Sequence, residues 1–242
     1  MDKDQQKITW QGEVVSVQPR STVWRYLTDN RTHRECGYNV FLKGEVCGDA
    51  PNSSLDKYDF CLAISEKQAV KIGIHIGDVL KGTAWTKKYP EIEFADYYRA
   101  GGIKKLSGSP AEKMTIKMED TRYDGTSIPR VNSADYPGPP WKTEAPPLEI
   151  YAWRGERMLS KAAWKGKCFE CIWANMSNVT IQYDFDRNLV RNRFETFCYG
   201  PMSCRYYKCG PARAVPYKGR ESAMDEGWLD EICCEYRHDP NE

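Results

Sequence analysis

The sequence predicts a mostly β protein, in which a small closed barrel of five strands is followed by a compact module rich in cysteine. Three observations lead to this fold class. Apolar and polar residues alternate repeatedly through residues 8–106, the helical period is scarce there, and residues 151–242 contain two pairs of closely spaced cysteines. Between them, YPGPPWKTEAPP makes residues 107–150 rich in proline, which predicts an extended linker lying along the barrel.

The first strands of the barrel are predicted by residue type and by alternation. KITWQGEVVSV and TVWRYL are rich in β-branched and aromatic residues, which favour strands. CGYNVFLKGEV alternates, so Tyr38, Val40 and Leu42 share one face of a strand. Phe41 and Lys43 share the other face, which we expect to be turned to solvent.

The remaining barrel elements follow in order. KYDFCLAI alternates in the same way, and EKQAVKIG after it has the pattern of a short helix. IGDVLKGTAWTK begins at a Gly-Asp turn and aligns Lys81, Thr83, Trp85 and Lys87 on one row, which we also expect to face solvent. About 100 residues of this kind suit a small closed barrel.

The segments KIGIHIGDVLKGTAWTK and ADYYRAGGIKKL resemble the later strands of an OB-fold, the five-stranded Greek-key barrel, and the resemblance extends over residues 8–106. An SH3-like barrel would give a similar pattern. OB-folds stack nucleic-acid bases on aromatic side chains and meet phosphates with basic ones. The resemblance therefore implies a face that binds single-stranded nucleic acid, and its candidate residues are Phe41, Lys43, Lys81, Trp85 and Lys87. Alternatively, the linker or the cysteine module covers the two aromatic residues.

The stretch CFECIWANMSNVTIQYDFDRNLVRNRFETFCYGPMSC places one cysteine pair at each of two turns. Between the pairs, NVTIQYDF and RNRFETF are typical of two strands joined at DRN, a hairpin that would bring the pairs together. Four thiolates around a tetrahedral ion, each pair at a turn, is the arrangement of a zinc ribbon. The sequence therefore predicts a structural zinc ion bound by Cys168, Cys171, Cys198 and Cys204.

Other interpretations of the cysteines stay open. An iron–sulfur cluster also takes four thiolates, and the module could hold no metal at all. Cys209 follows closely enough to compete with Cys204 for the fourth ligand position. Cys36, Cys47 and Cys61 lie within strand patterns and no second pair faces them, so we expect that they bind no metal.

Charge is distributed unevenly along the chain. The formal net charge of +1 argues against wholesale coating of nucleic acid. Yet residues 187–220 carry eight basic residues and one acid, and residues 221–242 carry eight acids and one base. The acidic tail would either dock on the basic segment or compete with nucleic acid for it. We expect a cytoplasmic protein with reduced cysteines, because the sequence shows neither a membrane-spanning apolar stretch nor the apolar core of a secretory signal.

No catalytic motif is found in the sequence. It has no G-x-S-x-G, no glycine loop for phosphate and no H-E-x-x-H, so binding is favoured over catalysis. RFETFCYGPMSC and YKCGPARAVPYKG also resemble bacterial proteins of uncharacterised function that join an OB-like domain to a cysteine module. Two alternatives to nucleic-acid binding stay open. One is a protein–protein adaptor, and the other is similar to the OB-fold and zinc-ribbon proteins that engage acyl-CoA beside thiolases, although those place the ribbon first.

Overall fold

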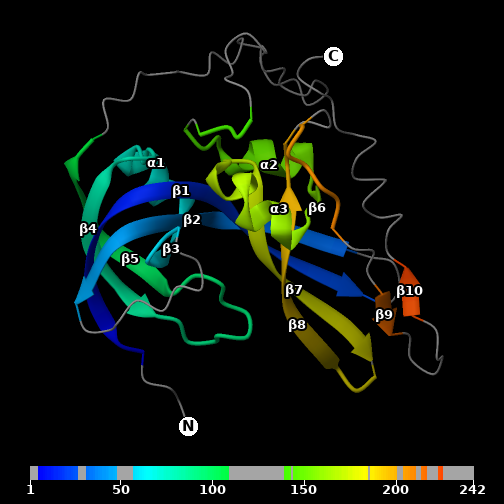
Figure 1. Cartoon of the computed structure of the whole chain (residues 1–242). Helices are drawn as coiled ribbons and strands as arrows, with labels where there is room; N and C mark the ends of the chain where they lie inside the picture. Colours follow the sequence, from blue (N-terminus) through cyan, green and yellow to red (C-terminus); the bar gives the residue numbers. More distant parts are fainter. Residues whose placement is uncertain are drawn as a thin grey trace.

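The computed structural model describes residues 5–26, 31–47, 57–108, 139–142, 144–184, 186–200, 204–210, 214–216 and 223–225 (Figure 1). The fold is mostly β, as predicted. Eight strands form one sheet in the order β2-β3-β5-β4-β1-β7-β8-β6, and β9 and β10 form a separate pair. The strands are β1 (Lys7–Tyr26), β2 (Arg31–Cys47), β3 (Phe60–Ile64), β4 (Val79–Thr86), β5 (Tyr97–Ser107), β6 (Arg157–Met158), β7 (Ala174–Asp184), β8 (Leu189–Cys198), β9 (Ala214–Pro216) and β10 (Ala223–Asp225). The helices are α1 (Glu66–Ile72), α2 (Leu148–Arg154), α3 (Lys161–Lys165) and a 3₁₀ helix (Lys167–Glu170).

Five of the strands close on themselves in a ring. β1 pairs with β2 on one side and with β4 on the other, β2 pairs with β3, and β5 pairs with both β3 and β4. All of these pairings are antiparallel except that of β3 with β5. Figure 1 shows the ring at the left of the view, with α1 between β3 and β4 at its upper edge. The five strands expected in residues 8–106 are thus present and form a ring.

α1 is the short helix expected at EKQAVKIG, and the sequence determines both of its ends. The side chain of Ser65 accepts the Gln68 N–H, and the side chain of Gln68 accepts the Ser65 N–H in return (3.2 Å). Gly73 ends the helix in the left-handed conformation with φ of 60°, which glycine adopts at little cost.

Gly12 and Gly44 allow β1 and β2 to approach closely within the ring. The two residues are paired in the register of these strands. A Cβ on Gly44 would lie 2.2 Å from the carbonyl oxygen of Gln11, and a Cβ on Gly12 would lie 2.8 Å from that of Lys43. Only glycine fits such an approach, and the ring can therefore bend and close at this point.

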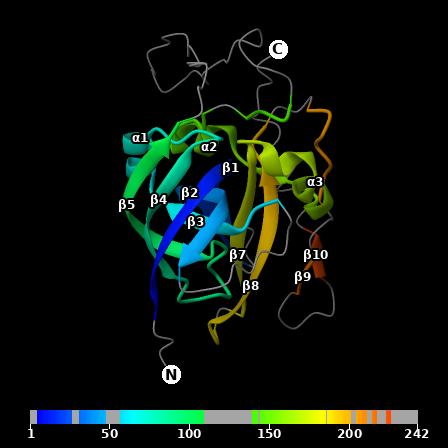
Figure 2. The ribbon, with the colours of Figure 1, turned by 60° about the vertical axis from the view of Figure 1, so that its left-hand side comes forward.

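β1 and β2 are longer than the ring requires, and their hairpin carries the sheet onward. Residues 22–26 of β1 pair in parallel with residues 178–182 of β7, β7 pairs antiparallel with β8, and β6 lies on β8. Figure 2 shows β7 and β8 beside the ring, with α2 and α3 across the upper end. The two regions expected as a barrel and a separate cysteine module therefore share one sheet.

Phe41 lies at the centre of the core, and the expectation that it faces solvent is wrong. Its side chain is 0% exposed. Its ring centroid is 4.9 Å from that of Tyr58, 5.0 Å from that of Phe169 and 6.2 Å from that of Trp164. α3 and the 3₁₀ helix supply Trp164 and Phe169, so a layer from later in the chain covers the face of β2 that alternation assigned to solvent.

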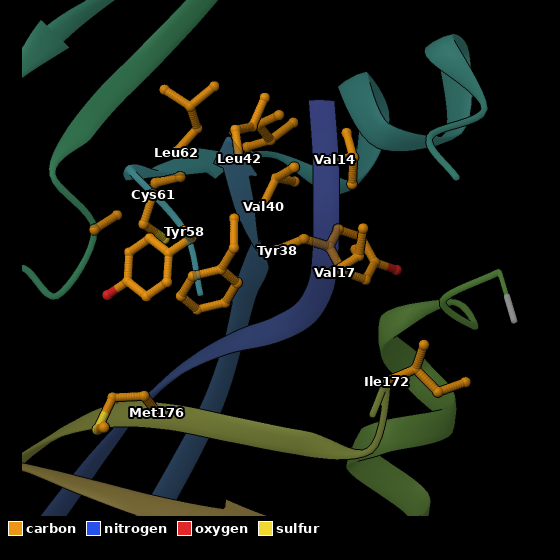
Figure 3. Close-up of a cluster of buried hydrophobic side chains, with 14 of the residues drawn as sticks. Val14, Val17, Tyr38, Val40, Leu42, Tyr58, Cys61, Leu62, Ile172 and Met176 are labelled. Atoms are coloured by element: carbon orange, nitrogen blue, oxygen red, sulfur yellow. The ribbon is translucent and has the colours of Figure 1, made fainter. Parts of the chain in front are cut away.

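The other face of β2 contributes to the interior of the ring. Figure 3 shows Val40 and Leu42 of β2 with Leu62 of β3 among buried apolar side chains, whereas Cys61 lies opposite Phe41 and shares its face. A second, smaller cluster lies under the extension of the sheet and consists of Val23, Met158, Val179, Ile181 and Phe197. Among the described residues, the helices are all too short or too polar to cross a membrane.

The proline-rich region is described from 139 to 142 and from 144 onward. Trp141 is buried in the main core, and its carbonyl oxygen accepts the N–H of Ile172 (2.9 Å). Trp141 therefore packs beside the cysteine-bearing turn. The rest of the expected linker lies outside the described residues.

Candidate functional site

The first cysteine pair lies on a tight turn between the 3₁₀ helix and β7. Cys168 is in the helix, and the N–H of Cys171 donates to its carbonyl oxygen (3.0 Å). β1 fixes this turn, because the hydroxyl of Ser16 (2.6 Å) and the side-chain amide of Gln18 (2.7 Å) both donate to the carbonyl oxygen of Phe169. Buried hydrogen bonds thus hold the first pair on the ring.

The second pair follows the end of β8. Cys198 is the last residue of β8 and pairs with Ala174 at the start of β7, so the predicted hairpin is confirmed and brings Cys198 beside the first turn. The N–H of Gly200 donates to the Cys198 sulfur (3.3 Å). Cys204 opens the next turn, in which its carbonyl oxygen accepts the N–H of Tyr207 (3.0 Å).

The fold brings the four predicted thiols within electrostatic reach of one another. Burial, together with the neighbouring Cys198 and Cys204, raises the pKa of Cys168 to about 12. Burial also raises the pKa of Cys171, with Cys198 and Cys168 adding to it, and the pKa of Cys204, with Cys198 adding to it. None of the four forms a disulfide. Thiolates that repel one another in this way are stabilised by a cation between them.

Three of the four sulfur atoms accept hydrogen bonds from backbone N–H groups, and each has a donor two residues further along the chain. Such bonds favour the thiolate over the thiol, and the thiolate is the form that binds metal. The donor set suits a tetrahedral zinc ion. The donors are Trp141 and Trp173 for Cys171, Gly200 for Cys198, and Tyr206 and Tyr207 for Cys204.

The sulfur atoms are nevertheless not placed as metal ligands. In the described part of the chain, no three His, Cys, Asp or Glu side chains form a group that could hold an ion. Cys168 instead directs its sulfur to the carbonyl oxygen of Tyr206 (3.7 Å), as a neutral thiol does. The fit to zinc therefore rests on the donor set and its amide hydrogen bonds, and not on ligand distances.

The remaining described cysteines lie in other surroundings. Cys209 is exposed, whereas Cys204 is half-buried and interacts electrostatically with Cys198. Cys61 is buried on β3 among apolar side chains (Figure 3), Cys36 is half-buried and Cys47 is exposed. That these three bind no metal stays a prediction.

A second candidate site is a hollow of about 700 Å³ against β1, β2, β4 and β5, which we call the basic groove. Three exposed lysines line it, Lys43, Lys81 and Lys104, against two carboxylates, Glu13 and Glu45. In the register of β4 and β5, Lys81 lies directly opposite Lys104. The groove therefore carries an excess of positive charge, concentrated on one cross-strand pair.

The basic groove contains part of the predicted nucleic-acid face. Lys43 and Lys81 line it. Trp85 of β4 and Lys87, which follows the end of β4, are half-buried and do not line the groove. Phe41 lies in the core. Lys104 also lines the groove and was not among the predicted residues, although the doublet KK at 104–105 indicates an exposed basic strand end.

The charged C-terminal segments are only partly described. Arg187, Arg191, Arg205 and Lys208 are exposed and lie on β8 or in the segments that flank it, whereas strands of the ring line the groove. The acidic segment 221–242, apart from 223–225, lies outside the described residues. The described residues of the basic segment therefore do not form one track with the basic groove.

A buried ionic network joins the long hairpin to the second half of the sheet. Nδ1 of His33 lies 3.1 Å from Oε1 of Glu156, and its Nε2 lies 3.2 Å from Oε1 of Glu35 and 2.9 Å from the hydroxyl of Tyr199. Burial lowers the pKa of His33, but Glu156 and Glu35 outweigh it and bring the pKa to about 9. His33 is therefore charged at neutral pH. This network could not be predicted from the sequence, because its members come from β2 and from the segments beside β6 and β8.

This network is expected to make stability depend on pH above neutrality. A raised pKa contributes stability that is complete below the unfolded value of 6.5 and is lost as pH rises through about 9. Between pH 7.0 and pH 9.5, the free energy of unfolding measured in urea should therefore fall more for the parent than for His33→Gln, because glutamine does not titrate. Equal losses in the two proteins would contradict a charged His33 between the two glutamates.

Comparison with models of protein families, with curated proteins and with solved structures finds no match to this chain.

Proposed function

We propose that the protein binds single-stranded nucleic acid in the basic groove, on an OB-like barrel that a structural zinc ion stabilises. The observation that carries this proposal is the pair formed by Lys81 and Lys104. Like charges directly opposite each other on neighbouring strands destabilise a sheet. A phosphate bound between the two ammonium groups would attract both of them and remove their mutual repulsion, which favours binding.

The strand order supports the interpretation of the ring as OB-like. β1, β2 and β3 are neighbours in chain order, and β5 then lies between β3 and β4, so the ring closes out of sequence order. A Greek-key barrel of the OB type would have this strand order, with a helix at the place of α1 between the third and fourth strands. The resemblance seen in residues 8–106 implies the same architecture.

The groove is suited to an extended anionic chain. Its lining comes from four adjacent strands. Glu45 lies across β1 from Lys81, and Lys43 lies two residues from Glu45 on β2. Thr83 lines the groove, and Trp85 follows it two residues later on the same face of β4. A base stacked on Trp85 would gain about 1–3 kcal/mol.

The zinc ion has a structural role in this proposal. Four thiolates leave it no open position for a substrate, so the metal stabilises the cysteine turns and takes no part in chemistry. The thiols must be reduced to bind it, which is consistent with the cytoplasm. An iron–sulfur cluster on the same residues is the alternative, and brown protein with labile sulfide would identify it.

Binding of a fluorescent oligo-dT is expected to weaken as salt rises. Each phosphate neutralised on single-stranded nucleic acid adds about 0.7 to the slope of log K against log salt. Lys81→Ala and Lys104→Ala should each reduce that slope by about this amount. Trp85→Ala should weaken binding by about 1–3 kcal/mol and leave the slope unchanged.

Lys67→Ala is the matched control, because Lys67 is an exposed lysine on α1, outside the groove. Its slope should equal that of the parent. If oligo-dT does not bind at low salt, or if Lys81→Ala behaves as Lys67→Ala does, the nucleic-acid proposal is wrong. The acyl-CoA alternative would be favoured if coenzyme A by itself displaces oligo-dT from the parent but not from Lys81→Ala.

A further inference from the structure

A smaller pocket of about 300 Å³ lies at another place on the ring. It is formed by the end of β3, the start of α1, the start of β5 and the loop after β4, and it shares no lining residue with the basic groove. This volume is at the lower end of the range for small-molecule sites. The pocket therefore suits a ligand of the size of one nucleotide.

The pocket is positively charged. Arg20, Lys88 and Arg99 line it, and Glu93 is its acidic member. Both backbone N–H groups at the start of the loop, those of Lys88 (2.6 Å) and Tyr89 (2.7 Å), donate to Oε2 of Glu93. The Glu93 charge thus holds the loop in shape, and the three cations exceed it by two charges.

Arg20 retains hydrogen-bonding capacity inside the protein. Its Nη2 donates to the carbonyl oxygen of Cys36 (2.5 Å), which fixes the guanidinium. Its Nε is buried and has no hydrogen-bond partner among the described residues. A buried donor without a partner costs free energy, and this Nε is shielded from the pocket, so Arg20 acts on the pocket through its positive charge.

Arg99 is held in a conformation that its residue type disfavours. Its φ is 52°, in the left-handed region, where non-glycine residues are uncommon. The reason is a β-bulge. β4 advances two residues from Thr83 to Trp85 while β5 goes back three residues from Gly101 to Tyr98, so β5 carries one extra residue here. Backbone strain of this kind costs about 1–3 kcal/mol and is concentrated at functional sites.

Two tyrosines complete the pocket. Tyr89 is 45% exposed and has the Lys88 ammonium 5.2 Å from its ring centroid, and Tyr98 has the Arg20 guanidinium 5.8 Å from its own. Each cation is therefore placed beside an aromatic surface. A ligand that combines an aromatic base with a phosphate matches both features.

We propose that this pocket binds a nucleoside monophosphate group, with its phosphate on Arg20, Lys88 and Arg99 and its base against Tyr89 or Tyr98. The group can be a free mononucleotide or the phosphorylated end of a strand, since the chemistry is the same. The proposal does not depend on the basic groove, because the two sites have no residue in common.

Isothermal titration with AMP, adenosine and inorganic phosphate tests this proposal. AMP should bind more tightly than either of its parts. Arg99→Gly should weaken AMP binding by about tenfold or more, because a charge-assisted hydrogen bond is lost. The same variant should keep or raise the melting temperature, because glycine relieves the left-handed strain. Loss of binding without loss of stability separates a ligand site from a structural residue.

Two further measurements complete the experiment. Lys81→Ala should bind AMP as the parent does, so failure of the groove proposal and failure of this one can be distinguished. A comparison of oligo-dT with and without a 5′-phosphate distinguishes a strand end from a free nucleotide as the ligand. If the protein prefers the phosphorylated strand and Arg99→Gly removes this preference, the ligand is a strand end. If AMP binds but the phosphorylated strand is not preferred, the ligand is a free nucleotide. No AMP binding at millimolar concentration, or equal binding by Arg99→Gly, overturns the proposal.

Discussion

Substitution of Cys198 by Ser is expected to abolish zinc binding and to unfold the half of the sheet that contains β7 and β8. Cys198 interacts electrostatically with Cys168, Cys171 and Cys204, so its loss affects the whole centre. In small zinc modules, metal binding contributes on the order of 10–16 kcal/mol, as large as the stability of an entire domain. The parent should contain one zinc ion per chain by elemental analysis. Hydrogen exchange over residues 139–210 should lose protection in the variant and on chelation.

Two control proteins define the ligand set. Cys209→Ser should keep its zinc, since Cys209 is exposed and outside the cluster. The triple variant Cys36→Ser, Cys47→Ser, Cys61→Ala should also keep its zinc. Alanine at position 61 leaves a small cavity in the core, which lowers the stability of this variant somewhat. Zinc lost from either control, or a parent that contains no metal, would refute the proposed centre.

Phe41→Ala is expected to reduce the free energy of unfolding by about 3–5 kcal/mol, the usual cost of removing a large aromatic side chain from a core. The reason is its position between Tyr58 of the ring region and the later residues Trp164 and Phe169. Its removal opens a cavity where the ring meets the helical layer. The measurement is urea unfolding followed by tryptophan fluorescence.

Val70→Ala is the matched surface control, since Val70 is 71% exposed on α1 and should change stability by no more than about 0.5 kcal/mol. The folded fraction of Phe41→Ala should bind oligo-dT with unchanged affinity, because a buried ring cannot stack on a base. If Phe41→Ala reduces the free energy of unfolding by less than about 1 kcal/mol and also weakens oligo-dT binding, Phe41 faces solvent and is not buried.

The parts of the fold that the sequence predicted are those with local causes. The β7–β8 hairpin could be predicted because two strand-like segments are joined by DRN, and α1 because EKQAVKIG has the pattern of a short helix. The cysteine pairs are close in sequence, so their turns could be predicted as well. In each case, the residues that fix the element lie within a few positions of it.

The parts that the sequence did not predict depend on distant residues. Alternation shows which side chains share a face of β2, but only α3 and the 3₁₀ helix, more than 100 residues later, decide that the face of Phe41 is buried. Lys81 and Lys104 become a pair only through the register of β4 with β5. The His33 network likewise needs the folded positions of Glu156 and Tyr199.

The parallel pairing of β1 with β7 has a consequence for synthesis of the chain on the ribosome. Residues 22–26 of β1 have emerged long before residues 178–182 of β7 exist. At ordinary translation speeds of about 5–20 residues per second, this edge of β1 waits roughly 8–30 s for its partner. Unpaired N–H and C=O groups on such an edge are a template for association with other nascent chains. The newly made N-terminal half is therefore most exposed to aggregation on polysomes, where neighbouring copies are close together, until β7 has been translated.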